Sequence, residues 1–392
     1  MIRAGAGYST APNPRIAATE ATRAAMQQAG LRIASAAFCF ISAKFGDAYP
    51  LMLRIVRESA GTSNVVGCET IGAIANGREF ESGCSIAVLV FDSDALSAKR
   101  FFVPQLRNRA IQAAQELAAA VRPHLASNNL LTIFADTYNL DAAAFVESIS
   151  AELPGVALAG GGATEDGAIG ETFQFCGDVV SSNAISAMLL AGDFDLRLDS
   201  ALACTPVGPA HRITAVRDNV ILELDGHSAY ESFCTAAGPL ADDPRRAAAF
   251  IMLGIPLSAD SDRLERGNYY VRNIVGVSAD HGAIAVAHRP KINDLVGFVL
   301  RNAERSRSEL KAMLERLAGA ARKPPSFGLY FDCVSRGSGL YNLPDHDSAY
   351  ISQQFAGLPV AGFFTGFEFG PLANLPGLLQ YSGVLTLIAE QG

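Results

Sequence analysis

The chain has 392 residues, of which 49% are hydrophobic and 18% are charged, and its formal net charge is -8 at pH 7. This composition is typical of a folded protein with about two domains and argues against intrinsic disorder. The acidic balance argues against a main role in binding nucleic acid, because neutralising phosphates requires a concentrated basic surface.

The sequence contains no segment that resembles a signal peptide or a membrane span, since no continuous apolar run approaches bilayer length. We therefore expect a cytoplasmic protein without membrane insertion. The seven cysteines are scattered without a C-x-x-C pair, and the six histidines lack metal-ligand spacing. No metal site is predicted.

Three stretches of the chain share one order of parts: a buried strand, a helix, a second strand, a glycine-containing turn and a third strand. The first copy covers 37–41, 48–59, 65–72 and 84–91; the second covers 130–134, 141–153, 156–162 and 184–190; the third covers 327–331, 348–355, 360–366 and 384–388. A strand–helix–strand unit implies a parallel pair, whereas the third strand is more easily antiparallel. The sheets should therefore be mixed.

Between the copies, apolar residues at helical spacing predict two further helices, at 109–125 and 304–318. A helix is also predicted at 228–238, and a natural domain boundary falls near Asp225. The expected fold is α/β, with mixed sheets flanked by helices and repeated β-α-β-loop-β units in two associated domains. We assign 1–33 to an N-terminal segment with a helix, 34–225 to the first domain and 226–392 to the second.

The ordered motifs along nearly the whole chain resemble the FIST family of sensory proteins, with a FIST N-terminal and a FIST C-terminal domain. The motifs that carry the resemblance are Gly67 to Gly72, Gly160 to Gly162, Pro206 to Pro209, Ile221 to Gly226, Tyr270 to Ile274, Phe331 to Gly337 and Glu368 to Pro371. Two positions depart from the family pattern: Phe367 replaces a common glycine, and Asp332 replaces a common serine.

The resemblance implies a sensory protein in intracellular signal transduction that binds small molecules such as amino acids. It also implies a separate signalling partner, because we recognise no output domain in the sequence. Some members are similar to haem-binding sensors of nitric oxide, so haem is the alternative cofactor, although none is expected. The departures at Phe367 and Asp332 prevent us from carrying over a ligand identity.

Ligands of open α/β sheets bind at the carboxyl ends of the strands. The candidate ligand-binding residues follow such strands and are expected to line a pocket between the two domains: Arg272, Asn273, Cys333, Ser335, Arg336, Thr365 and Glu368. An arginine fork and a glutamate can hold an amino acid zwitterion. The alternative is that Arg336 and Glu368 pair with each other and that Arg272 and Asn273 satisfy loop carbonyls.

A second alternative is a cysteine-dependent enzyme. Cys333 near Arg336 is a candidate nucleophile, and His346 on the following loop is a candidate base, although the pairing depends on the tertiary structure. The chain lacks the G-x-S-x-G and phosphate-loop motifs of common enzyme classes. We therefore favour a binding protein over an enzyme.

Overall fold

The computed structural model describes residues 1–258, 261–265, 268–320, 323–372 and 375–391. These residues form two compact units. Unit 1 comprises Met1–Ala201, Leu310–Leu378 and the C-terminal segment from Ser382, and unit 2 comprises Leu202–Glu309 with Leu379–Tyr381. Along the chain, unit 2 is thus bracketed by segments of unit 1.

Unit 1 contains the predicted repeats, each longer than the sequence pattern indicated because a further strand and helix precede it. The first repeat runs β1 (Ile2–Ser9), α1 (Pro14–Ala29), β2 (Ala36–Ser42), α2 (Tyr49–Ala60), β3 (Val65–Thr70), β4 (Ala73–Ala75), β5 (Arg78–Phe80) and β6 (Ile86–Ser93). The second runs β7 (Leu96–Pro104), α3 (Ala110–Val121), β8 (Asn128–Ala135), α4 (Ala142–Glu152), β9 (Ala157–Gly162), β10 (Gln174–Cys176), β11 (Val179–Ser181) and β12 (Ala184–Gly192).

The third repeat is interrupted by unit 2, which enters the chain between its first strand and its first helix. It runs β13 (Phe194–Leu202), α7 (Ala303–Gly319), β22 (Phe327–Cys333), α8 (Gly337–Tyr341), α9 (His346–Gln354), β23 (Val360–Thr365), β24 (Glu368–Leu372), β25 (Leu375–Leu379) and β26 (Ser382–Glu390). The predicted helix at 304–318 therefore corresponds to α1 and α3 of the other repeats.

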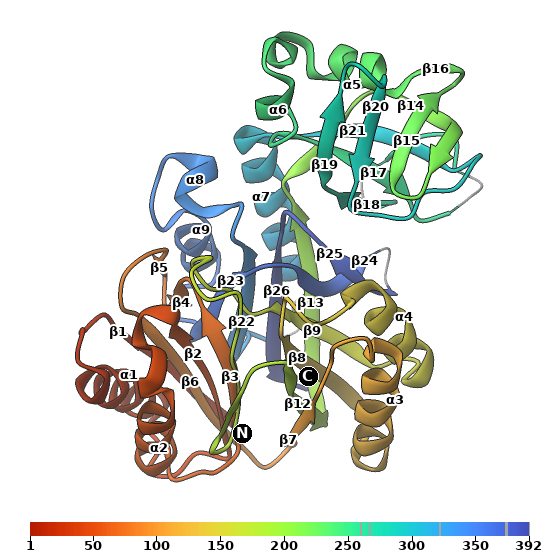
Figure 1. The fold of residues 1–392 in the computed structure, drawn as a ribbon. Coiled ribbons are helices and arrows are strands. Elements are labelled where there is room, and N and C mark those ends of the chain that lie inside the picture. The colour runs from red at the N-terminus through yellow and green to blue at the C-terminus, as the bar shows by residue number, and fades with distance from the viewer. Residues whose placement is uncertain (259–260, 266–267, 321–322, 373–374, 392) are drawn as a thin grey trace. The chain divides into compact units, whose positions relative to one another are not determined.

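The strand pairings confirm the predicted mixed sheets. The parallel pairs are β2 with β3, β8 with β9 and β22 with β23. The antiparallel partners of β2, β8 and β22 are β6, β12 and β26, respectively. Figure 1 shows α1 and α2 on the outer side of the first sheet, and α3 and α4 on the outer side of the second.

The repeats are joined by an exchange of hairpins. The β4–β5 hairpin of the first repeat extends the third sheet beside β23, and the β10–β11 hairpin of the second extends the first sheet beside β3. The β24–β25 segment of the third repeat extends the second sheet beside β9. Each six-stranded sheet is therefore completed by a neighbouring repeat, which closes unit 1 into a cycle.

The three sheets meet at equivalent phenylalanines on β2, β8 and β22. The ring centroids of Phe40 and Phe134 are 5.3 Å apart, those of Phe134 and Phe331 are 5.9 Å apart, and those of Phe40 and Phe331 are 6.5 Å apart. All three side chains are fully buried, and aromatic pairs of this geometry add about 0.5–1.5 kcal/mol beyond the area they bury.

Local sequence explains where the first helices begin and end. The side chain of Asn13 caps α1 by accepting hydrogen bonds from the backbone N–H groups of Arg15 and Ile16, and Pro14 occupies the first helical position. The helix ends at Gly30, whose left-handed backbone (φ 64°) suits glycine.

Unit 2 is built on one curled antiparallel sheet. Its elements are β14 (Cys204–Arg217), β15 (Val220–Leu224), β16 (His227–Ser228), α5 (Ala229–Ala237), α6 (Pro244–Ala247), β17 (Ile251–Pro256), β18 (Tyr269–Arg272), β19 (Ile274–Ser278), β20 (Ala283–Val286) and β21 (Leu295–Arg301). The sheet order is β18-β17-β21-β14-β15-β20-β19, yet β18 and β19 are separated in sequence only by Asn273. The two edges of the sheet therefore meet at that residue.

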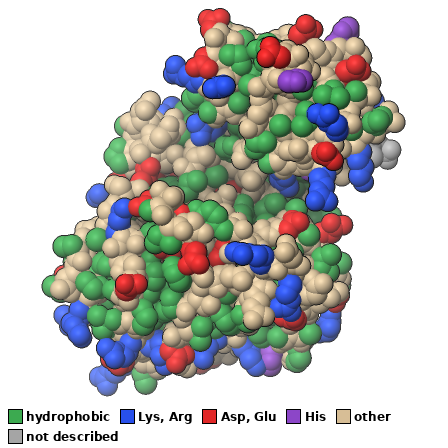
Figure 2. Space-filling model, viewed as in Figure 1, with side chains coloured by type: hydrophobic (Ala, Val, Ile, Leu, Met, Phe, Trp, Pro, Cys, Tyr) green, Lys and Arg blue, Asp and Glu red, His purple; other side chains and the backbone are tan. Residues whose placement is uncertain are grey.

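On the face of the molecule shown in Figure 2, basic and acidic side chains are interspersed. Among the residues that the structure describes, no helix is long and apolar enough to cross a membrane.

Candidate functional site

The carboxyl ends of β22 and β23 bring several of the predicted residues together. Cys333 lies opposite Thr365 in the parallel register. The Thr365 hydroxyl oxygen lies 3.0 Å from the Asp332 carbonyl oxygen and 2.5 Å from Oε1 of Glu368, and the Ser382 hydroxyl donates to Oε2 of Glu368 at 2.6 Å. The Glu368 carboxyl is thus held by two hydroxyl groups.

Glu368 is fully buried, and this burial raises the pKa of its carboxyl to about 7, against the lowering effect of hydrogen bonds from Ser382, Thr365 and Cys333. A buried carboxyl that titrates near neutrality can hold or release a proton at physiological pH.

This shift predicts a pH-dependent stability. Between about pH 4.5 and 7 the folded protein binds more protons at Glu368 than the unfolded chain, so stability falls as the pH rises through that window. Between pH 5 and pH 8, the loss of unfolding free energy should be smaller in the Glu368→Gln variant than in the wild type, by up to about 3 kcal/mol. Thermal unfolding at both pH values measures the difference; the exposed Glu147→Gln variant is the control, and an unchanged pH dependence in Glu368→Gln would contradict the assignment.

Cys333 is buried, with 4% of its surface exposed, and its Sγ lies 3.0 Å from the hydroxyl oxygen of Ser335. His346 is also buried; its Nδ1 lies 2.8 Å from Oδ1 of Asp347, and its ring stacks on Tyr341 at 3.6 Å. These contacts direct the imidazole toward the Asp347 carboxylate. The Cys333–His346 dyad stays a prediction.

Arg336 is fully buried and has two carboxylate partners. Its Nε lies 2.7 Å from Oδ1 of Asp332, and one terminal nitrogen lies 2.5 Å from Oδ2 of Asp347. The Tyr330 hydroxyl donates to the same Asp347 oxygen at 2.7 Å. Arg336 holds the pKa of Asp347 well below its usual range, whereas burial raises the pKa of Asp332 well above it. Both carboxyl groups contact the guanidinium, so the charge of Arg336 is compensated within the protein.

Glu79 joins this cluster from the exchanged β4–β5 hairpin. Its Oε1 accepts a hydrogen bond from the backbone N–H of Ser348 at 2.7 Å, while its Oε2 has no partner among the described residues. Burial, reinforced by the charge of Asp347, raises the pKa of Glu79 to about 7. Sequence reasoning did not identify Glu79, Asp347 or Ser382, because only the strand exchange and the turn after β25 bring them to this edge.

Arg272 and Asn273 belong to unit 2, at the corner between β18 and β19. Only 9% of the surface of Arg272 is exposed. Its guanidinium lies 4.5 Å from the centre of the Tyr270 ring and donates to the Val271 carbonyl at 2.8 Å. Asn273 accepts a hydrogen bond from the Tyr381 hydroxyl through Oδ1.

The electrostatic environment of Arg272 differs from that of Arg336. Among the residues that the structure describes, no carboxylate pairs with Arg272, and burial lowers the pKa of its guanidinium. A buried charge without a counter-ion costs several kcal/mol, which a bound anion can offset. Of the predicted residues, Arg272 is therefore the one whose surroundings point most directly to a ligand.

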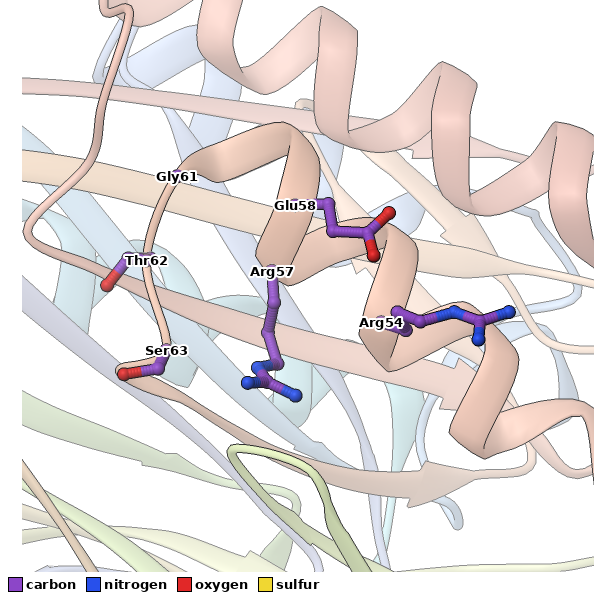
Figure 3. Close-up of a pocket in the computed structure, with 6 residues that line it drawn as sticks. All are labelled: Arg54, Arg57, Glu58, Gly61, Thr62 and Ser63. Carbon is purple, nitrogen blue, oxygen red and sulfur yellow. The ribbon is translucent and has the colours of Figure 1, made fainter.

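Cavities occur elsewhere in both units. In unit 1, a cavity of about 390 Å³ lies at the end of α2 and is lined by Arg54, Arg57, Glu58, Gly61, Thr62 and Ser63 (Figure 3). In unit 2, a cavity of about 370 Å³ is lined in part by His211, His227 and Phe298. Within the described ranges, no group of three or more histidine, cysteine, aspartate or glutamate residues is arranged to hold a metal ion.

Comparison with known proteins shows that the chain contains two sensory domains of signal transduction. The FIST N domain matches residues 35–227, and the FIST C domain matches residues 229–371. These matches cover most of the sequence, and the chain therefore belongs to the FIST family.

Two similar curated proteins are uncharacterized proteins of mycobacteria. One from Mycobacterium tuberculosis is 25% identical over 390 residues, which cover 99% of this chain and 100% of the relative. One from Mycobacterium bovis is 24% identical and covers 99% of each chain. Among solved structures, a cyanuric acid hydrolase from A. caulinodans is 11% identical, with a TM-score of 0.37 over 100% of this chain and 99% of that chain. That likeness is too weak to carry an argument.

Proposed function

We propose that this protein is a small-ligand sensor that binds an anionic metabolite, such as an amino acid or a related carboxylate, through Arg272, and that it signals through a separate partner protein. The observation that carries the proposal is the burial of the Arg272 guanidinium without a carboxylate partner among the described residues. The membership of the FIST family supports a sensory role.

The position of Arg272 suits anion binding for three reasons. The guanidinium presents a planar fork that matches the two oxygens of a carboxylate. It lies beside Tyr270, which packs against the hydrophobic core of unit 2, where a low dielectric strengthens an ion pair. It also neighbours Asn273, whose amide adds polar hydrogen-bonding capacity beside the charge.

Arg336 is less suited to the same task. Its guanidinium already contacts Asp332 and Asp347, so a ligand carboxylate would have to displace an internal one. In this proposal Arg336 is a structural residue, and Glu368 and Thr365 belong to its neighbourhood rather than to the anion site.

A ligand can signal only if it binds one conformation of the protein better than another. Neutralising the charge of Arg272 supplies such a difference, because the cost of burying the cation falls when the anion is present. A partner that recognises the ligand-bound conformation then receives the signal.

The test is a thermal-shift and calorimetry panel of amino acids, other carboxylates and phosphates, with absorption spectra recorded alongside to detect haem. A ligand at about one hundred times its Kd should stabilise the fold by about 2.7 kcal/mol, a shift of several degrees. In the Arg272→Gln variant the same ligand should bind at least about tenfold more weakly, since a charge-assisted pair is lost.

The matched control is Arg263→Gln, which removes an exposed arginine of unit 2 that pairs with Glu265. This variant should retain wild-type binding. The proposal is overturned if no anion in the panel stabilises the wild type, or if Arg272→Gln binds the ligand as tightly as Arg263→Gln does.

A further inference from the structure

The Tyr270 ring contacts two basic side chains from different segments of unit 2. The guanidinium of Arg272 lies over one face of the ring, with its carbon 4.5 Å from the ring centre. The imidazole of His288, which follows β20, meets the same ring at 6.0 Å in an edge-on arrangement with an interplanar angle of 71°. Arg272 is nine-tenths buried and His288 is half-buried.

Charged groups on β18 and in the loop that follows His288 act on its imidazole. Arg272 on β18 and Lys291 in the following loop disfavour a charged imidazole, whereas Asp294 in the same loop favours it. Burial, followed by the charge of Arg272, lowers the pKa of His288, so that without a bound anion its ring is neutral at pH 7. The described residues provide no hydrogen-bond partner for this imidazole.

We propose that Arg272 and His288 form one anion site across Tyr270, in which His288 takes up a proton from solvent when the anion binds. The proposal rests on the proposed function, since it requires Arg272 to bind an anion. A bound anion removes the repulsion between the Arg272 charge and a protonated His288 and adds an attraction of its own. The proton moves onto a ring nitrogen of His288, and no bond to the ligand is formed or broken.

The ligand class follows from the charge of the occupied site. Arg272 and a protonated His288 together supply two positive charges, only partly balanced by Asp294. A ligand that carries two anionic groups, or one doubly charged oxyanion, balances them better than a monocarboxylate does. We therefore infer selectivity for dicarboxylates or tetrahedral dianions over single carboxylates such as acetate.

The proton uptake is measured by titration calorimetry with sulfate and with L-aspartate. Both probes keep the same protonation state between pH 6 and pH 8, so any proton taken up binds to the protein. Acetate and an equal ionic strength of chloride are the controls. Each titration is repeated in two buffers that differ in ionisation enthalpy, so that the difference in observed heat gives the number of protons taken up. We expect uptake of about half a proton or more near pH 7 and binding up to about tenfold tighter at pH 6 than at pH 8.

The His288→Gln variant should bind the same probe without pH dependence and without proton uptake, whereas Arg272→Gln should lose binding at both pH values. The preferred probe, sulfate or L-aspartate, shows whether the site accepts a tetrahedral oxyanion or a dicarboxylate. Binding without proton uptake, or binding of acetate as tight as that of sulfate and L-aspartate, overturns this inference and leaves the proposed function standing. Binding of no anion overturns both.

A measurement without ligand tests the same coupling. In the Arg272→Gln variant the His288 imidazole should titrate at a higher pH than in the wild type, as followed by NMR, because its cationic neighbour is gone. An unchanged titration of His288 would show that the two groups are not coupled, and the two-cation site would be rejected.

Discussion

Replacing Arg336 by methionine is expected to lower the free energy of unfolding by about 3 to 5 kcal/mol, because removal of one partner leaves the buried Asp347 carboxylate without its counter-ion. The Tyr330 hydroxyl alone cannot replace a guanidinium that contacts both Asp332 and Asp347. Chemical denaturation followed by circular dichroism measures the loss. If the variant proves too unstable to purify, the double variant Arg336→Met with Asp347→Leu should recover part of the stability, because both charges are then removed.

The matched control is the equivalent change at a second buried arginine, Arg272. Arg272→Met removes a cation that has no carboxylate partner among the described residues, so the ligand-free variant should be as stable as the wild type or more stable. The opposite result, with Arg336→Met stable and Arg272→Met unfolded, would reverse the roles that we assign to the two arginines.

Replacing Gly362 by alanine is expected to destabilise unit 1 by about 2 to 4 kcal/mol, because the added methyl group would overlap the carbonyl oxygen of Tyr330 on the neighbouring strand. Backbone atoms cannot move aside as a flexible side chain can, so the parallel pair of β22 and β23 would have to separate. Gly67 and Gly160 occupy the equivalent positions against Cys39 and Ile133, and their alanine variants should show losses of the same order.

The control for this series is Gly339→Ala in α8. Gly339 is exposed, and an added methyl group meets no atom within 4 Å. Because alanine favours helix over glycine by about 0.5–1 kcal/mol, this variant should be unchanged or slightly more stable. Equal losses at Gly362 and Gly339 would mean that the close approach of the strands is not what requires glycine.

Much of the fold could be predicted from the sequence because its signals are local. The runs at 37–41, 130–134 and 327–331 are apolar over the length of a strand, as strands buried on both faces require. The order of strand, helix and strand implied the parallel pairs that the structure contains. The antiparallel third strands were predicted on the same basis and are confirmed.

Only part of the candidate site could be predicted from the sequence. Thr365 and Glu368 could be placed at the edge that carries Cys333, since all three follow neighbouring parallel strands. The partners of Arg336 could not be predicted from the sequence: Asp332 precedes it by four residues at the end of β22, and Asp347 lies beyond a turn on α9. Arg272 differs from Arg336 in having no carboxylate partner among the described residues, and residue identity alone does not reveal this difference.

The sequence by itself determined the repeating strand–helix–strand units and the family, because hydrophobic periodicity, turn glycines and motif order are properties of short segments. Tertiary structure alone decided that hairpins are exchanged between repeats and that unit 2 interrupts the third repeat. It also decided that the charge of Arg336 is compensated by carboxylate partners. These outcomes depend on contacts such as that of Glu79 with Ser348, which are 269 positions apart. Hydrogen bonds and ion pairs depend on the separation of two groups in space, over a few ångströms. The number of residues between the two groups does not reveal this separation.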